Sequence, residues 1–270
     1  MVIALTRTPS PHLDRCQLTH RARQPIDIGK AREQHREYEY ILTGLQARIL
    51  HLPDGVFVQD TALVCDELAV TATLGAPSRR DEAASTLMAL APFRESIPLA
   101  PPATFDGGDI IIAPARSDWS SHVFVGLTGR TNRSAVEQLR DVMQTELRRY
   151  HVRPLRVAGC VHLKSGCSYI GRETFVVNRR WVDANAIEAE GFRCIDVAQE
   201  EPFGANTLTV HGTIIVPASC PRTADAIARA GYSVMPVDIS EFEKAEAGVS
   251  CMSLLVTVIP ALMAVTPDRK

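Results

Sequence analysis

The sequence predicts an α/β fold, a five-bladed pseudo-symmetric propeller of ββαβ modules that forms a single domain over residues 1–270. Three observations lead to this prediction. Two strand-like runs, a helix and a third strand-like run recur about every 40–55 residues, a period typical of propellers and solenoids. A short polar motif begins each repeat. The final repeat lacks a partner that the N-terminal strand would supply, which favours a closed ring. An ordinary α/β domain with irregular hairpins is the alternative.

The first two repeats carry clear helix signals. The first extends from Phe57 to Leu90, and its helix opens near Arg79–Asp81, where acidic side chains suit the positive end of the helix dipole. The second begins at Phe105 and returns through the strand HVFVGL. Its helix is predicted by apolar residues that recur at helical spacing, at positions 135, 136, 139, 142, 143 and 147.

The remaining repeats follow the same order. The third begins at His162 and enters a helix near Val182, and the fourth begins at Ala205. In the fourth repeat, His211-Gly212 predicts a tight hairpin and Pro221 suits the first turn of a helix. The fifth begins with the run GVSCMSLLVTV, and the N-terminal run VIALTRTP would complete it.

Composition narrows the class of protein. The chain is 46% hydrophobic, enough for a sizeable core, and its net charge of −2 provides no basic field for nucleic acid. No apolar run approaches the ~18–20 residues that span a bilayer, and no secretory signal begins the chain. The seven cysteines are odd in number and form no CxxC pair, which favours free thiols. We therefore expect a cytoplasmic protein without a membrane partner.

Two local patterns suggest ligands and are better explained without them. Cys160, His162 and Cys167 do not match a common zinc spacing, so no metal is expected. The basic stretch 148–153 is interpreted as a solvated helix end rather than a nucleic-acid patch.

The polar motifs that begin the repeats are the candidate site. In a ring, equivalent positions of the repeats converge on the axis, so these motifs would share one central cleft. They would bring together carboxylates, a histidine and a thiol, from Asp60, Asp106–Asp109, His162–Ser165, Asn206 and Cys251.

This set favours covalent chemistry on a cation. A thiol beside a histidine is a nucleophile–base pair. Nearby carboxylates repel a thiolate, but they suit a guanidinium, whose charge would help stabilise the thiolate on binding. Arg79 and Arg130 each follow the second strand of a repeat and could bind a substrate carboxylate. A cationic head and an anionic tail describe an arginine derivative.

Each candidate also has a purely structural interpretation. Cys251 could be inert core in an apolar strand, and His162 a hydrogen-bonded residue at a strand start. Asp60 and Asp106 could be turn formers, and Arg79 and Arg130 could be solvated residues at helix starts.

Several motifs occur in a specific order along the chain: PDGVFVQD, GAPSRR, DGGD, GRTN, HLKSGCSY, AN and SEFEKAEAGVSCMS. With these motifs the sequence resembles the dimethylarginine dimethylaminohydrolases, members of the guanidino-group-modifying (amidinotransferase-like) superfamily. The resemblance runs from Ala4–Pro9 to Ser250–Leu255, and the family's fold is a five-fold ββαβ propeller.

The resemblance implies a role for each matching residue. Cys251 would attack the guanidino carbon, His162 would protonate the leaving dimethylamine and then activate water, and Asp106 would orient His162. The resemblance also implies four kinds of substrate contact. Asp60 and the neighbouring position Gln59 would face the guanidinium, and Asp54 the α-amino group. Arg79 and Arg130 would hold the carboxylate, and the main-chain carbonyls of Leu18 and Ala245 would also contact the substrate. Leu18 would lie in a mobile loop over the site. The products would be citrulline and dimethylamine, with no metal or organic cofactor.

Three departures from the family pattern bear on the substrate. Gln59 stands where the family usually has Glu, the stretch before Asp54 is shorter, and Ala245-Glu246-Ala247 replaces an apolar-Asp-Gly sequence. Arginine deimination or hydrolysis of another alkylguanidine is therefore the second hypothesis, and a guanidino-binding protein without turnover the third. The expected partner is a small-molecule substrate. The oligomeric state is left open, with a homodimer as one candidate.

Overall fold

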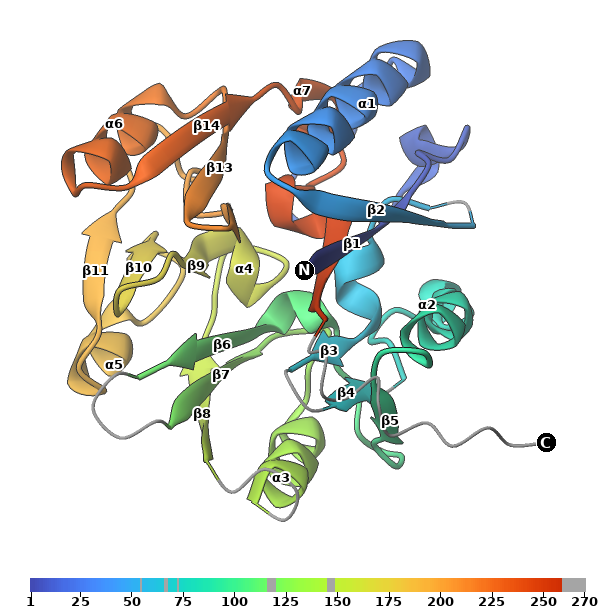
Figure 1. Ribbon diagram of the computed structural model, residues 1–270, viewed down its shortest axis with the longest axis vertical. Coiled ribbons are helices and arrows are strands. Elements are labelled where there is room, and N and C mark those ends of the chain that lie inside the picture. The colour runs from blue at the N-terminus through green and yellow to red at the C-terminus, as the bar shows by residue number, and fades with distance from the viewer. Residues whose placement is uncertain (54, 66–67, 72, 116–119, 145–148, 259–270) are drawn as a thin grey trace.

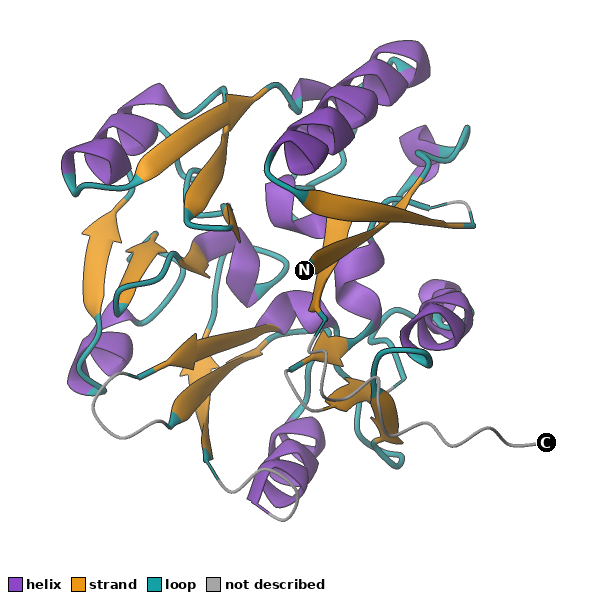
Figure 2. Ribbon diagram, viewed as in Figure 1, coloured by secondary structure: helices purple, strands orange, loops and turns teal. Residues whose placement is uncertain are grey.

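The computed structural model describes residues 1–53, 55–65, 68–71, 73–115, 120–144 and 149–258. Within them the strands form five three-stranded sheets around a common centre, and the longer helices lie at the periphery (Figure 1 and Figure 2). In every sheet one pair of strands is antiparallel and the other is parallel. The predicted fold class, a five-module ββαβ propeller, is confirmed.

Four modules are continuous in sequence. The first two comprise β3 (Leu63–Val64), β4 (Leu68–Thr71), α2 (Glu82–Leu90) and β5 (Glu95–Pro98), then β6 (Ile110–Pro114), β7 (Ser121–Leu127), α3 (Arg133–Val142) and β8 (Tyr150–Arg156). The next two comprise β9 (Cys167–Tyr169), β10 (Thr174–Val177), α5 (Ala184–Ala189) and β11 (Arg193–Asp196), then β12 (Leu208–Val210), β13 (Thr213–Pro217), α6 (Pro221–Arg229) and β14 (Ser233–Val237). Two short helices, α4 (Leu163–Gly166) and α7 (Ser240–Glu243), lie between modules.

The fifth module joins the two ends of the chain. β1 (Val2–Arg7) pairs antiparallel with β15 (Ser253–Thr257) and parallel with β2 (Ala47–Leu52), and α1 (Ile28–Gly44) connects β1 to β2. The register places Val2 opposite Thr257. Pairing of the two ends therefore closes the ring, as the incomplete last repeat predicts.

Local signals in the fourth module are also confirmed. His211 and Gly212 have φ angles of 46° and 82°, the left-handed values that a two-residue hairpin between β12 and β13 requires. Pro221 is the first residue of α6, where its missing N–H leaves no hydrogen bond unmade.

The core lies between neighbouring modules. Among the described residues, the buried apolar side chains form five clusters, and each cluster draws on two adjacent modules. One cluster, for example, packs Leu63 and Phe105 of the first two modules against Leu139. Burial of apolar surface contributes about 25 cal/mol per Å², so these contacts hold the ring together. None of the described helices has the length and apolar character needed to cross a membrane.

The polar motifs occupy equivalent turns just before the first strand of each module. Asp60 lies in the 3₁₀ helix Val58–Thr61, Asp106 precedes the 3₁₀ helix Gly107–Asp109, and His162 precedes α4. Cys251 lies in the 3₁₀ helix Val249–Met252, not in the strand that follows it. The turn at 58–61 contacts those at 107–109 and 249–252, so the motifs converge on the ring axis as expected.

Candidate active site

A cavity of about 770 Å³, including its open mouth, lies where these turns meet. Its walls come from the first, second and fifth modules, from the turn that opens the third module and from the loop after β1. The lining residues are Arg15, Cys16, Gln17, Phe57, Asp60, Ser78, Arg79, Glu82, Arg130, Val161, His162, Ala245, Glu246 and Cys251. A thiol, an imidazole and a carboxylate therefore share one cavity.

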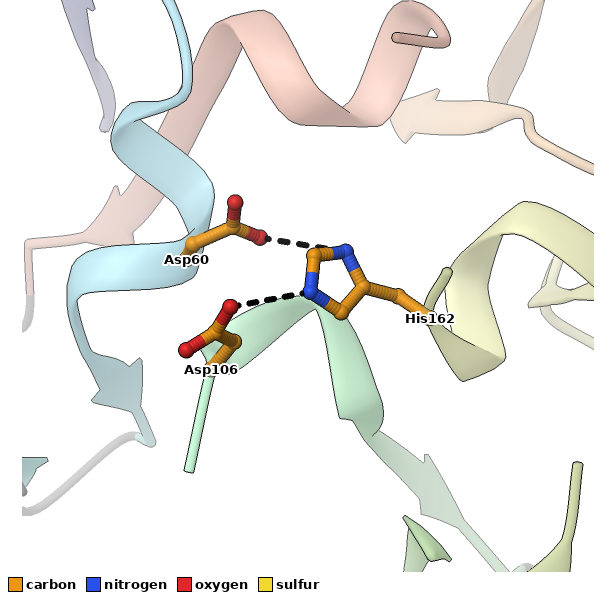
Figure 3. A group of neighbouring side chains, drawn as sticks. All are labelled: Asp60, Asp106 and His162. Atoms are coloured by element: carbon orange, nitrogen blue, oxygen red, sulfur yellow. Dashed lines mark hydrogen bonds and ion pairs between the residues drawn. The ribbon is translucent and has the colours of Figure 1, made fainter. Parts of the chain in front are cut away.

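His162 is held between two carboxylates (Figure 3). Its Nε2 lies 3.0 Å from Oδ2 of Asp106, and its Nδ1 lies 3.7 Å from Oδ1 of Asp60. Asp106 is fully buried, and its other oxygen accepts a hydrogen bond from the main-chain N–H of Gly75 at 2.9 Å. The predicted contact between Asp106 and His162 is present, and it fixes the plane of the imidazole.

The backbone around this histidine is equally constrained. Asp109 accepts a hydrogen bond at 2.9 Å from the N–H of Leu163, the residue after His162. Gly108 leaves room for the ring, because a Cβ there would lie 2.8 Å from the imidazole Nδ1 and 2.7 Å from Asp60 Oδ1. Both ends of the DGGD motif thus position His162, one through its side chain and one through its backbone.

The charge of His162 follows from its neighbours. Burial disfavours the imidazolium, but the carboxylates of Asp60, Asp106 and Asp109 outweigh it and raise the pKa of His162 to about 9. The ring therefore carries a proton at neutral pH, and it can act as a general acid.

Cys251 is buried and bonded to two N–H donors. Its Sγ lies 3.4 Å from the N–H of Gly248 and 3.9 Å from Nδ2 of Asn206. Burial, and then the charge of Asp60, raise the pKa of the thiol to about 11. The resting site at neutral pH therefore holds a neutral thiol beside an imidazolium.

Asp60 provides the anionic wall of the cavity. Although burial opposes ionisation, the charges of His162 and Arg79 hold the pKa of this carboxyl below its usual value. Its Oδ2 accepts a hydrogen bond from Arg79 at 2.8 Å, whereas its Oδ1 has no hydrogen-bond partner among the described residues. A buried, ionised oxygen that accepts no hydrogen bond is suited to a guanidinium N–H.

The two arginines differ in their partners. Arg79 is paired with Asp60 and, through two hydrogen bonds, with Glu82. Arg130 also lines the cavity, and its Nη2 donates to Oε1 of Gln17 at 3.2 Å. Arg130 is therefore the more available cation for a substrate carboxylate, while Arg79 would first have to share or leave its acidic partners.

The loop after β1 lies over the cavity and is held there by one carboxylate. Glu246 accepts hydrogen bonds from the main-chain N–H groups of Thr19, His20 and Arg21, at 2.9, 2.6 and 2.5 Å. Leu18 is part of this loop, but the loop residues that line the cavity are those at positions 15–17.

Gln59 faces a second cavity on the other side of the turn that carries Asp60. Its Nε2 donates to the carbonyl of Gly107 at 3.1 Å, and its Oε1 has no partner among the described residues. Lys164 shares this second cavity and donates to the same carbonyl at 3.0 Å. Gln59 therefore does not line the cavity that holds Cys251, and a role for it in substrate choice stays a prediction. Asp54 lies outside the described residues.

The residues Asp60, Asp106 and His162 offer ligand atoms within 4.8 Å of one another, a spacing that a metal ion could use. Both ring nitrogens of His162, however, face carboxylate oxygens, and its pKa of about 9 keeps both protonated. As they stand, these residues form a hydrogen-bonded imidazolium between two carboxylates.

Sequence reasoning missed two residues of the site. The sequence marks Glu246 only as a departure from the family pattern, and Lys164 only as one residue of the HLKS motif. Glu246 contacts residues 225–227 positions away in the sequence, and Lys164 contacts a residue 57 positions away. No local sequence pattern indicates such contacts. Asn206, in contrast, begins a repeat, and that position was the available signal.

The fold and the site define a class: an α/β propeller with a thiol, a carboxylate-bonded histidine and an anionic wall around one cavity. No family model matches the chain. A Pseudomonas aeruginosa protein named N(G),N(G)-dimethylarginine dimethylaminohydrolase is 32% identical, over 93% of this chain and 97% of that protein. A protein of the same name from Streptomyces coelicolor is 33% identical, over 93% and 95%.

Solved structures agree with these relatives. The structure of DDAH from Pseudomonas aeruginosa, a cysteine-to-serine mutant complexed with citrulline, has a TM-score of 0.84 at 31% identity and covers 94% of this chain and 98% of its own. The N-terminal domain of ArgZ, a cyanobacterial arginine dihydrolase, has a TM-score of 0.82 at 18% identity, which shows the fold alone. The chain belongs to the dimethylarginine dimethylaminohydrolase family.

Proposed function

We propose that the chain hydrolyses Nω-methylated arginine, dimethylarginine above all, to citrulline and the corresponding methylamine. The observation that carries this proposal is the shared cavity of Cys251, His162 and Asp60, in which a nucleophile, a protonated general acid and an anionic oxygen that accepts no hydrogen bond from the described residues meet. The two named relatives and the citrulline-bound structure support the choice of substrate.

Substrate binding activates the nucleophile in this mechanism. The guanidinium donates hydrogen bonds to Asp60, which offsets the negative charge that disfavours the thiolate of Cys251. The thiol then loses its proton to solvent, and its sulfur forms a bond to the guanidino carbon. A resting thiol with a pKa of about 11 therefore becomes reactive only when a cation fills the site.

His162 then acts twice. Its imidazolium donates a proton to the dimethylamino nitrogen, the C–N bond breaks, and dimethylamine leaves a thiouronium on Cys251. The neutral imidazole next accepts a proton from water, the oxygen attacks the same carbon, and the C–S bond breaks. Citrulline and the thiolate are released, and the hydrogen bond to Asp106 holds the ring in place for both steps.

Contacts beyond the reacting centre orient the amino-acid end of the substrate. Arg130, and Arg79 once it shares its acidic partners, bind the α-carboxylate, and Ala245 lines the wall beside it. The predicted main-chain contact of Leu18 would come from the loop that Glu246 holds over the cavity.

A substrate panel tests the proposal. Citrulline release is measured for arginine, monomethylarginine and asymmetric dimethylarginine at equal enzyme concentration. We expect a higher kcat/KM for the methylated forms than for arginine. A higher value for arginine would favour a deiminase, and binding without citrulline or amine release would favour a binding protein.

We further propose that the protein works in the cytoplasm. None of the seven cysteines, all of which lie in the described residues, forms a disulfide, which fits a reducing compartment. A homodimer stays a prediction that light scattering of the purified protein checks.

A further inference from the structure

Asn206 opens the fourth repeat, and the mechanism above gives this polar residue no role. It begins the fourth module, is 2% exposed, and follows the fully buried Ala205. Its side chain reaches the nucleophile, with Nδ2 3.9 Å from Sγ of Cys251. The position equivalent to Asp60, Asp106 and His162 in the ring is therefore occupied by a neutral amide that contacts the reacting sulfur.

The orientation of this amide is fixed by a second hydrogen bond. Oδ1 of Asn206 accepts from the main-chain N–H of Ser250 at 3.0 Å. Because a main-chain N–H can only donate, the amide atom that faces Ser250 must be the oxygen, so Nδ2 faces Cys251. A Cβ on Gly248 would lie 2.1 Å from Cγ of Asn206, so only glycine allows the amide to pack against this turn.

Two N–H donors thus point at one sulfur. The N–H of Gly248 lies 3.4 Å from Sγ, and Nδ2 of Asn206 is the second donor. Hydrogen bonds to an anion are stronger than those to a neutral acceptor, so both donors stabilise the thiolate more than the thiol. Both are uncharged, and they therefore help form an anion without repelling a guanidinium in the same cavity.

We propose that Asn206 is a further catalytic residue, which donates a hydrogen bond to the thiolate of Cys251 and so makes the nucleophile available. This inference rests on the proposed function for its consequence on turnover, but its direct effect is on the thiol alone. Three titratable groups interact electrostatically with this thiol: a carboxylate, an ammonium and a phenol, from Asp60, Lys164 and Tyr38. The imidazolium of His162 and the carboxylate of Glu246 line the same cavity.

The alternative is a purely structural role, in which Asn206 only holds the turn through Ser250. Asn206→Ala removes both hydrogen bonds. Asn206→Asp keeps an acceptor of the same shape for Ser250 N–H and replaces the donor by an acceptor. Thr207→Val is the matched control, because this buried neighbour has a hydroxyl without a partner among the described residues and does not contact the sulfur.

The experiment measures alkylation of Cys251 by iodoacetamide in the substrate-free enzyme, from pH 7 to 10, by mass spectrometry of the peptide that contains it. We expect both Asn206 variants to react about 10-fold more slowly than the parent at each pH, since a shift of one pKa unit changes the thiolate fraction tenfold. Thr207→Val should match the parent. With dimethylarginine, kcat should fall about 10- to 100-fold in Asn206→Ala.

Unchanged alkylation in either variant that folds, as judged by circular dichroism, would overturn the proposal. A lower melting temperature with unchanged alkylation would indicate the structural role instead. Because the assay contains no substrate, its result stands even if dimethylarginine proves not to be the substrate, so failure of the two proposals is distinguishable.

Discussion

Nε2 of His162 lies 3.0 Å from Oδ2 of Asp106, and the charge of Asp60 and this bond together keep the imidazole protonated. The carboxylate is fully buried and also bonded to the N–H of Gly75, so it cannot turn away. With Asp60 on the opposite side of the ring, it keeps the pKa of His162 near 9 despite burial. His162 is therefore protonated in the resting site and can act as an acid rather than as a base.

Asp106→Asn tests this relationship through pH. Loss of the carboxylate lowers the pKa of His162, so the proton is lost at lower pH and the alkaline limb of kcat/KM moves down from about 9. We expect kcat near neutrality to fall roughly 10²- to 10⁴-fold, the usual value of general acid–base help. The exposed Asp225→Asn is the control, and an unmoved alkaline limb would contradict the assignment.

Cys251→Ser tests the nucleophile. A hydroxyl is a far weaker nucleophile than a thiolate, so citrulline release should fall by roughly 10⁴-fold or more. Substrate binding should persist within about threefold by calorimetry, since Asp60 and Arg130 are unchanged. Cys65→Ser, at a buried thiol outside the cavity, serves as the control. Retained turnover would refute the assignment.

Activation of the thiol by a cation predicts selectivity between alkylating reagents. At pH 7.5 the free thiol, with a pKa of about 11, should react slowly with neutral iodoacetamide. A cationic haloacetamidine can bind Asp60 and stabilise the thiolate. It should therefore label Cys251 at least 10-fold faster than expected from the rate at which the same reagent labels a small free thiol. Mass spectrometry measures the ratio of the labelling rates with the cationic and the neutral reagent. An equal ratio for the enzyme and for a small free thiol would argue against cation-assisted activation.

Arg130 should affect binding rather than chemistry. A charge-assisted hydrogen bond to a carboxylate is worth about 1.5–3 kcal/mol, so Arg130→Ala should raise KM about 10- to 100-fold with kcat within a few-fold of the parent. Arg130→Lys should recover part of this loss. Steady-state kinetics separate the two parameters, and a fall in kcat alone would place Arg130 in the chemical step instead.

Glu246 should control access to the cavity through the loop that it holds. Glu246→Ala removes the acceptor of three main-chain N–H groups, so the loop should open and trypsin should cleave at Arg21 or Arg23 at least several-fold faster. Glu243→Ala is the matched control, because its main-chain carbonyl still binds Arg21. Equal cleavage rates in both variants would show that Glu246 does not hold the loop.

Much of the fold could be predicted because the repeat is local. Apolar periodicity, the His211-Gly212 hairpin and the incomplete final module are properties of short segments, and each has its counterpart in the structure. The site could be predicted only as a set of residues. Repeat position brought Asp60, Asp106, His162 and Cys251 together, but it did not indicate the turn that holds Cys251.

The sequence by itself determined the five-module ring and the family, and it led to the prediction of Cys251 as nucleophile, because these depend on the order and spacing of residues along the chain. Tertiary structure alone decided which partner each side chain has. It turned Gln59 toward a second cavity, paired Arg79 with acids, held the loop with Glu246 and aimed the amide of Asn206 at the sulfur of Cys251. Such contacts join residues tens to hundreds of positions apart, and their pKa effects depend on burial and distance, which exist only once the ring has closed.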